Sequence, residues 1–155
     1  MINDYNDSHE AFVFFQQNVE VDPRAIEAYK AMILQKDYAY LIFQISDNKV
    51  IIQEKGDQKA SYSAFLTKFR QYVEGKKECR YGLATIKGHK DGELRAELVL
   101  ISYCVDDAPI RMRMLYSAAF GHLKVAFKEI RNIIITSNGS ELTEKNVKRT
   151  FHFDD

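Results

Sequence analysis

The sequence predicts one α/β domain of the α+β type, in which helices cover both faces of a central mixed sheet of about five strands. The length of 155 residues suits a single domain, and the 46% of hydrophobic residues is enough for a core. Segments with the apolar spacing of helices alternate with short strand-like runs. Two strand hairpins joined through helices give this mixed architecture.

The N-terminal segment is expected to differ from the rest of the chain. Residues 1–18 are predicted to form an acidic extension, and residues 19–155 to form the domain. Between residues 1 and 22 there are five acidic residues and no Lys or Arg. The sequence leaves open whether the short apolar run at residues 11–15 forms an edge strand, a short helix or a disordered segment.

The expected elements of the domain run in the order α-β-β-α-β-β-α-β-α. They are a helix at 23–36, strands at 38–45 and 50–52, a helix at 61–75, strands at 79–86 and 94–104, a long helix at 109–128, a strand at 130–136 and a last helix at 141–150.

Local signals support the first four elements. Asp22 can cap free backbone N–H groups, and Pro23 is tolerated at the first position of a helix. Ser46-Asp47-Asn48 has the composition of a turn, so the first two strands should form a hairpin. Ser61 can cap the second helix, whose apolar residues have helical spacing and which should end at Gly75.

Similar signals support the later elements. The polar segment Gly88–Gly92 predicts the loop of a second hairpin. The continuous apolar run Leu98–Ile101 is typical of a central strand that is covered on both faces. Asp106–Pro109 should begin the long helix, and Ser140 or Thr143 should cap the last one.

Composition excludes several classes of protein. The 22 basic and 22 acidic residues give a net charge of zero, which argues against binding nucleic acid through bulk positive charge and against a polybasic membrane tail. The acidic start is not typical of a signal peptide, and no run approaches the roughly 20 apolar residues of a membrane span. Cys79 and Cys104 lie in apolar segments, where free thiols are common, so we expect a reducing cytoplasm.

The sequence contains no motif for catalysis or for a cofactor. It has no Gly-rich phosphate-binding pattern and no Gly-x-Ser-x-Gly, and its four His residues lack metal-ligand spacing. We therefore expect neither an enzyme nor a bound metal or other cofactor. One enzymatic alternative stays open, a thiol enzyme that uses Cys79 or Cys104 with a partner distant in sequence.

The long helix is the most distinctive segment, because residues 109–131 hold five basic residues and one acidic residue. At 3.6 residues per turn, the stripe expected to face the sheet consists of Leu115, Ala119, Leu123 and Ala126. The outer stripe consists of Arg113, Ser117, Phe120, Lys124 and Lys128, with Arg111, Met114 and Ala118 beside it. This mixture of cations, small residues and apolar residues fits either a solvated face or a surface for a protein partner.

Three segments resemble one known family. Cys104–Ser117 contains an acidic residue, Ala-Pro, two basic residues, Met and Tyr in the order found at the start of that family's long helix. Glu74–Tyr81 resembles the approach to its strand after the second helix, and Val19–Pro23 resembles the segment before its first helix. The family is that of actin-depolymerising factor (ADF) and cofilin, and the resemblance covers about residues 19–151. The expected order of elements is that of the ADF-homology fold, and the form is most similar to nematode-type members.

The resemblance implies a function and a set of partners. Members bind actin monomers and filaments, prefer the ADP form, sever filaments and speed their depolymerisation without a cofactor. It further implies a monomeric protein of the cytoplasm and cytoskeleton, with phosphoinositides as additional ligands, while the zero net charge argues against a nucleic-acid partner.

The resemblance also implies two sets of contact residues. The surface for both monomers and filaments maps to Val19, Val21, Asp22, Arg111, Arg113, Met114 and Ala118. The surface for filaments alone maps to Lys90, Arg95, Glu144, Lys145, Lys148 and Arg149. Tyr116, within the same motif, is expected in the core.

Departures from the family pattern leave alternatives open. Val105 replaces a Pro, Ala118–Gly121 replaces a Ser pair and a charged pair, and the position of the regulatory Ser falls at about Gln17. The loop at 87–95 is short, and Leu94 occupies one of its usual basic positions. The alternatives are a module that mainly sequesters actin monomers with weak severing, and one that binds an actin-related protein complex in the manner of glia maturation factor.

Overall fold

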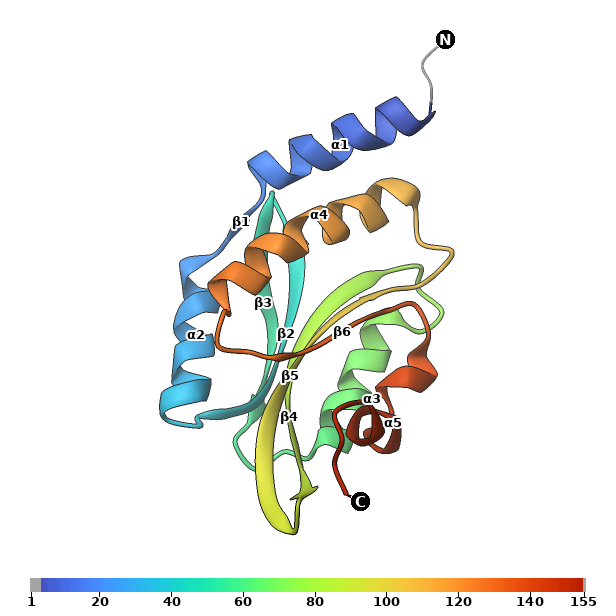
Figure 1. The fold of residues 1–155 in the computed structure, drawn as a ribbon. Helices are drawn as coiled ribbons and strands as arrows, with labels where there is room; N and C mark the ends of the chain where they lie inside the picture. The colour runs from blue at the N-terminus through green and yellow to red at the C-terminus, as the bar shows by residue number, and fades with distance from the viewer. Residues whose placement is uncertain (1–3, 155) are drawn as a thin grey trace.

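The computed structural model describes the backbone of residues 4–154 and the side chains of residues 9–154. It contains a mixed sheet with helices on both faces (Figure 1), as the sequence predicts, and the sheet has six strands instead of about five. The elements are α1 (Asp4–Asn18), β1 (Glu20–Val21), α2 (Pro23–Leu34), β2 (Tyr38–Ser46), β3 (Lys49–Asp57), α3 (Tyr62–Val73), β4 (Cys79–Lys90), β5 (Glu93–Cys104), α4 (Ile110–Ala126), β6 (Asn132–Thr136), a 3₁₀ turn η1 (Gly139–Leu142) and α5 (Glu144–Thr150).

The strands are arranged in the order β1-β3-β2-β4-β5-β6. The two predicted hairpins, β2–β3 and β4–β5, are antiparallel, and β2 also pairs with β4 in the antiparallel sense. The edge strands β1 and β6 pair in parallel with β3 and β5. β1 is the strand beyond the expected five, and its two residues are too few for a period-two pattern to be visible in sequence.

Helix starts agree with the sequence signals. Asp22 accepts a hydrogen bond from the backbone N–H of Arg24 at 2.8 Å, Ser61 accepts one from Ala64 at 3.0 Å, and Thr143 caps α5. These positions were predictable because a cap depends on the side chain and backbone of adjacent residues only.

The second hairpin differs from its prediction. A five-residue loop was expected at Gly88–Gly92, but the ladder continues to Lys90 and resumes at Glu93. The connection is the pair Asp91-Gly92, with φ of 51° and 81°. Such an Asp-Gly pair with positive φ is a favoured two-residue hairpin turn, and the polar residues before it extend the strand beyond the core.

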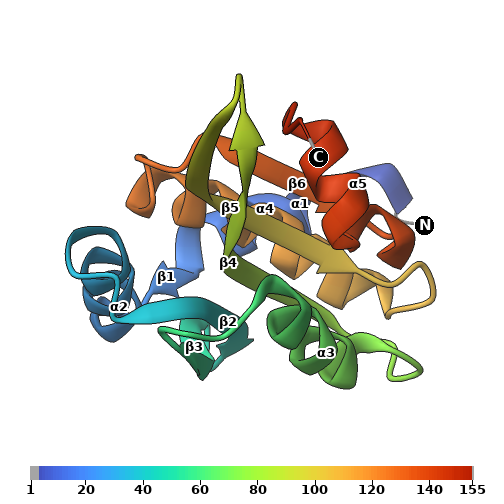
Figure 2. The same cartoon turned by 90° about the horizontal axis from the view of Figure 1, so that it is seen from below.

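Helices lie on both faces of the sheet (Figure 2), and a hydrophobic core lies on each face. The first lies beneath α2 and α4 and includes Tyr29, Phe43 and Leu123. The second lies beneath α3 and α5 and includes Phe65, Phe69 and Val147. Within the described residues, no helix is long and apolar enough to span a membrane.

The expectation of free thiols is wrong in this structure. Cys79 and Cys104 are joined by a disulfide, and the described chain has no free cysteine. The two residues lie directly opposite each other in the β4–β5 ladder, with their Cα atoms 4.1 Å apart. Directly opposite positions of an antiparallel pair bring two Cβ atoms close enough for this bond. Their pairing also removes the free thiolate that a Cys79 or Cys104 nucleophile requires.

The N-terminal segment forms a helix rather than an edge strand. α1 lies alongside α4, on the side of α4 that faces away from the sheet (Figure 1). Phe15 and Val19 are buried in the first core, and Ala11 and Phe12 pack against it. Helical spacing of these apolar residues places them toward α4 and accounts for the docking of the segment.

Candidate functional site

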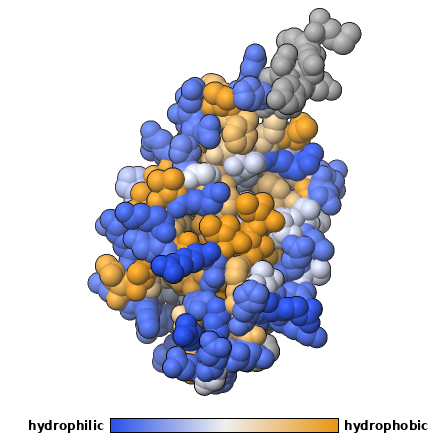
Figure 3. All heavy atoms as spheres, viewed as in Figure 1, coloured by the Kyte–Doolittle hydropathy of each residue, from blue (hydrophilic) through white to orange (hydrophobic). Residues whose placement is uncertain are grey.

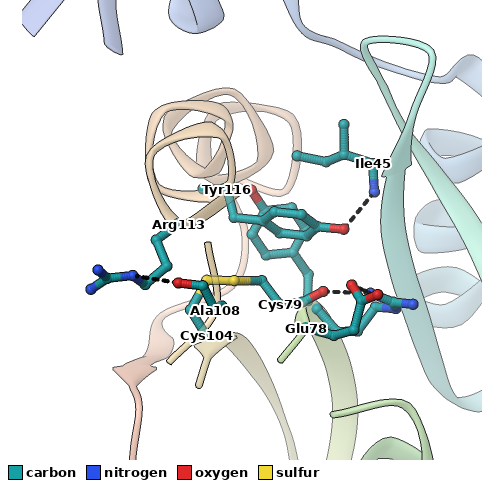
Figure 4. Close-up of a disulfide and its surroundings, with 9 residues drawn as sticks. Ile45, Glu78, Cys79, Cys104, Ala108, Arg113 and Tyr116 are labelled. Carbon is teal, nitrogen blue, oxygen red and sulfur yellow. Dashed lines mark hydrogen bonds and ion pairs between the residues drawn. A yellow bond between two sulfur atoms is a disulfide. The ribbon is translucent and has the colours of Figure 1, made fainter. Parts of the chain in front are cut away.

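Tyr116 fixes α4 on the sheet (Figure 4). Its hydroxyl accepts a hydrogen bond from the backbone N–H of Ile45 at 2.9 Å, and its carbonyl oxygen accepts one from the Tyr81 hydroxyl. Tyr116 is buried, as expected, and burial raises the pKa of its phenol above the ordinary value. The hydrogen bonds therefore set the rotation of α4 and decide which of its residues face outward.

Phe120 lies on the sheet side of α4, which corrects its assignment to the outer stripe. Its ring stacks on Tyr81, with centroids 5.5 Å apart and planes at 21°, and it is buried. Ala119 and Leu123 are buried as predicted, whereas Leu115 and Ala126 are only half-buried. The sheet-facing side of α4 is thus centred on Tyr116, and only Ala119 and Leu123 of the predicted stripe belong to it. The reason is that Tyr116 and Phe120 carry the large rings that fill the core.

The cations at the start of α4 point away from the core. Arg113 is exposed, and its Nε donates a hydrogen bond to the carbonyl oxygen of Ala108 at 3.2 Å (Figure 4). Arg111 is also exposed, and its guanidinium carbon lies 5.4 Å from the centroid of the Phe15 ring on α1. Both arginines therefore retain donors for an external carboxylate, although one of them already contacts α1.

Ala118 is covered even though it faces away from the sheet. At 3.6 residues per turn, it points about 200° away from Tyr116 around the α4 axis. A small residue on the outer side of a surface helix should be accessible, yet Ala118 is only 1% exposed. Phe12 and Gln16 of α1 line the same groove as Ala118, and the His122 ring contacts the carbonyl oxygen of Gln16. We conclude that α1 buries this position.

A groove of about 570 Å³ runs along α4 between α1 and the sheet edge. Arg113 and Lys124 contribute its cations, and Phe12 and Ile135 contribute apolar surface. Ile135 is 68% exposed on the edge strand β6, and apolar side chains gather over the middle of this face (Figure 3). The groove thus combines positive charge with apolar contact area, which suits a protein partner better than a small polar ligand.

The residues predicted before the first helix have structural roles. Val19 is buried, and Val21 lies in β1, where it pairs with Val50 of β3. Asp22 is buried at the start of α2, and hydrogen bonds from Arg24 hold its pKa below the ordinary value. This segment adjoins α1 and contacts α4 through β1, beside the end of α4 that is opposite its arginines (Figure 1).

The predicted filament residues come together at the other end of the molecule. Lys90 of β4 lies over the Phe153 ring, with its Nζ 4.7 Å from the centroid. The backbone N–H of Asp154 donates to the carbonyl of His89 at 2.7 Å, and its carboxylate accepts from the N–H of Gly92 at 3.0 Å. We call these Asp154 contacts the C-terminal clip, because they hold the segment after α5 against the turn of the β4–β5 hairpin.

Most charges on this second surface are paired. Lys90 Nζ lies 3.0 Å from Glu97 Oε1. Burial raises the pKa of Glu97, but hydrogen bonds from Lys90 and Asn132 outweigh it and leave the pKa below the ordinary value. The other predicted residues form pairs or lie exposed: Arg95 with Glu93 at 3.5 Å, Lys148 with Glu144 at 3.2 Å, and Lys145 and Arg149 on the exposed side of α5.

Sequence reasoning missed α1 as part of the site. The signal was present in the apolar run at residues 11–15, but five residues are too few to define a helix by periodicity. Its place on α4 depends on contacts between residues about 100 positions apart, such as Gln16 with His122. Among the described residues no group of His, Cys, Asp and Glu could hold a metal ion.

Comparisons with known proteins agree with this architecture. The model of the family described as cofilin/tropomyosin-type actin-binding protein matches residues 18–152. The chain is 31% identical over 139 residues to actin-depolymerizing factor 2, isoform c, of Caenorhabditis elegans, a match that spans 84% of this chain and 91% of that protein. It is 29% identical to the cofilin of Schizosaccharomyces pombe over 83% of this chain and 91% of the relative.

Solved structures have the same fold. The crystal structure of Streptomyces griseoflavus cofilin superposes with a TM-score of 0.72 at 22% identity, and the match covers 84% of this chain and 97% of that one. α1 precedes the region that the family model matches, and it reaches that region only at its last residue.

Proposed function

Because the chain belongs to the family of cofilin/tropomyosin-type actin-binding proteins, we propose that it binds actin monomers and filaments and promotes filament severing and depolymerisation. The single observation that best supports this is the position of Arg111 and Arg113. Both are exposed at the start of α4, on a helix that the buried Tyr116 fixes in rotation. Arginines held on a rigid helix are well suited to pair with carboxylates of a protein partner.

We assign two surfaces to actin. The first consists of Arg111, Arg113, Met114 and Ala118 on α4 together with Val19, Val21 and Asp22, and it serves both monomers and filaments. The second consists of Lys90, Arg95, Glu144, Lys145, Lys148 and Arg149, and it serves filaments alone. The C-terminal clip supports the second surface, since it joins the hairpin to the segment after α5.

The preferred partner in this proposal is ADP-actin, and the protein acts as a monomer in the cytoplasm, at the cytoskeleton. Phosphoinositides are further ligands of the α4 surface. Arg111, Arg113, Lys124 and Lys128 are all exposed there, and clustered cations attract polyanionic headgroups without a dedicated pocket. Actin binding and headgroup binding would therefore compete.

The double substitution Arg111→Ala, Arg113→Ala tests the first surface. We expect loss of monomer binding and of filament co-sedimentation, because removing charged contacts at a desolvated interface costs a few kcal/mol. Fluorescence titration of labelled monomers and pelleting of filaments measure the two activities. Lys68→Ala is the matched control, because Lys68 is an exposed cation on α3 across the sheet. Unchanged binding by the double variant would exclude this surface.

The tight β4–β5 turn favours a second candidate, monomer sequestration with weak severing. The connection has only two residues, Asp91 and Gly92, so the hairpin presents a small tip to a filament side. Microscopy of single filaments distinguishes the candidates, since severing produces new breaks and sequestration only slows assembly. Binding to an actin-related protein complex without binding to actin would support the third alternative, a module like glia maturation factor.

A further inference from the structure

The α1 helix occupies part of the surface that the proposed function assigns to actin. Arg111 lies over the Phe15 ring, and Ala118 is buried although it faces away from the sheet. We propose that α1 is an autoinhibitory segment, which must leave α4 before actin can bind there. This inference rests on the proposed function, because it takes the outer face of α4 as the actin-binding surface.

The contacts of α1 with α4 are of the kind that a competing partner can replace. Phe15 is 8% exposed and packs in the first core, whereas its neighbour Phe14 is 53% exposed. A polar contact between the two helices joins His122 to the carbonyl of Gln16, and a cation–π contact joins Arg111 to Phe15. An actin surface that offered apolar area and carboxylates would satisfy the same groups of α4.

The segment directly after α1 has its own hydrogen bonds to the sheet. Val19 is buried. The N–H of Glu20 donates to the carbonyl of Asn48 at 3.0 Å, and the N–H of Asp22 donates to the carbonyl of Val50 at 3.0 Å. These main-chain hydrogen bonds hold β1 on β3 independently of α1. The helix can therefore separate from α4 at Asn18 while β1 and the rest of the fold stay in place.

Competition of this kind lowers the measured affinity for actin. If the site is available only while α1 is detached, the apparent dissociation constant is the intrinsic one divided by the detached fraction. A change that weakens docking of α1 and leaves the rest of α4 intact therefore strengthens actin binding. This is the opposite of the result expected if α1 added contacts of its own to actin.

The substitution Phe15→Ala in the full chain tests the proposal. Removing the ring takes away a buried apolar contact of α1 with the first core, and we expect about tenfold tighter binding to monomeric actin. Phe14→Ala is the matched control, because it removes the same ring from an exposed position of the same helix. Its affinity should equal that of the unaltered chain.

Hydrogen–deuterium exchange of the unaltered chain provides a second test that needs no variant. We expect the backbone amides of residues 9–18 to exchange slowly in the free protein and faster when actin is added. Slow exchange of these amides in the actin complex would overturn the proposal, because α1 would then remain folded while actin is bound. Weaker binding by Phe15→Ala than by Phe14→Ala would also overturn it.

The result separates failure of this inference from failure of the proposed function. Equal, measurable affinity of the unaltered chain and both variants removes the autoinhibitory role and leaves actin binding intact. Absence of actin binding by all three proteins removes the proposed function, and the role of α1 with it. Tighter actin binding by Phe15→Ala alone, together with faster amide exchange of α1 when actin is added, supports both the autoinhibitory role of α1 and the proposed function.

Discussion

Gly82 on β4 is a position where one added carbon should disturb a core. A Cβ atom there would lie 2.7 Å from Cζ of Phe65 and 3.1 Å from Cε1 of Phe69. Both rings belong to α3, so the absence of a side chain at Gly82 lets this helix lie directly on the sheet. Neither ring can move freely, because their centroids are 5.3 Å apart in a packed cluster.

We therefore predict that Gly82→Ala lowers the free energy of unfolding by about 1–3 kcal/mol, the usual cost of overpacking. Urea unfolding followed by circular dichroism measures the change. Gly121→Ala is the control, since no described atom outside its own helix lies within 4 Å of an added Cβ there. In a helix interior that substitution should raise stability by up to about 1 kcal/mol. Equal stability of the two variants would contradict the prediction.

Residues were predictable where their role depends on neighbours in sequence. Asp22 and Ser61 cap helices as expected, Thr143 is the one of the two candidates that caps α5, and Tyr116 is in the core. The side of α4 taken by Phe120 was not predictable from the helix alone. It depends on the Tyr81 ring of β4, which meets Phe120 only in the folded sheet.

The β4–β5 hairpin is the element that connects the two proposed surfaces. Its disulfide, Cys79–Cys104, lies at the end next to the start of α4 (Figure 4), and its turn lies at the end next to the C-terminal clip. Cys104 is followed within six residues by Ile110, the first residue of α4. The disulfide therefore fixes the strand ends from which the arginine-bearing helix begins.

Reduction of this disulfide should lower the stability of the protein. The bond closes a loop with a sequence separation of 25 residues. Closing a loop of this size lowers the conformational entropy of the unfolded chain and so stabilises the folded state by about 3 kcal/mol. Thermal unfolding with and without dithiothreitol should show a lower melting temperature in the reduced sample. The variant Cys79→Ala, Cys104→Ala is the control, and its melting temperature should not respond to dithiothreitol. If dithiothreitol does not change the melting temperature of the unaltered chain either, the disulfide does not stabilise the fold.

At the level of elements, the sequence predicted the order of the helices and strands of the domain correctly, but it did not predict the edge strand β1 or the helix α1. Helices and central strands have long periodic patterns, whereas β1 has two residues and pairs in parallel with a strand that comes later in the chain. α1 is a helix of 15 residues that is held by contacts with α4, a helix far from it in the sequence. Long-range contacts of this kind leave no local signal.

For the whole molecule, neutrality hides a separation of charge. Five acidic residues lie between residues 1 and 22, and five basic residues lie between residues 109 and 131 with one acidic residue. The fold places α1 from the first segment beside α4 from the second. The acidic helix therefore lowers the positive potential that α4 presents to an acidic partner such as actin.

Neutralising three of these acidic residues, by Asp4→Asn, Asp7→Asn and Glu10→Gln, should raise the rate of association with actin at low salt. The gain should largely disappear near physiological ionic strength, where screening acts over about 8 Å. Stopped-flow measurements at two salt concentrations test this. Asp37→Asn, Asp57→Asn and Glu74→Gln change the net charge equally at other sites. An equal gain in that control would mean that total charge, and not the position of α1, controls the rate.

The C-terminal clip has a practical consequence for how the protein is labelled. Asp154 is bound at its backbone and its carboxylate to the tip of the β4–β5 hairpin. A fluorescent protein fused to the C-terminal segment would therefore be tethered at Asp154, next to the hairpin tip, and would shield the proposed filament surface while leaving the far end of the molecule open. In microscopy, such a fusion protein would show less binding to filaments than the unfused protein, whereas its binding to actin monomers would be unchanged. A small dye at an exposed position of α3, such as Lys68, would avoid this bias.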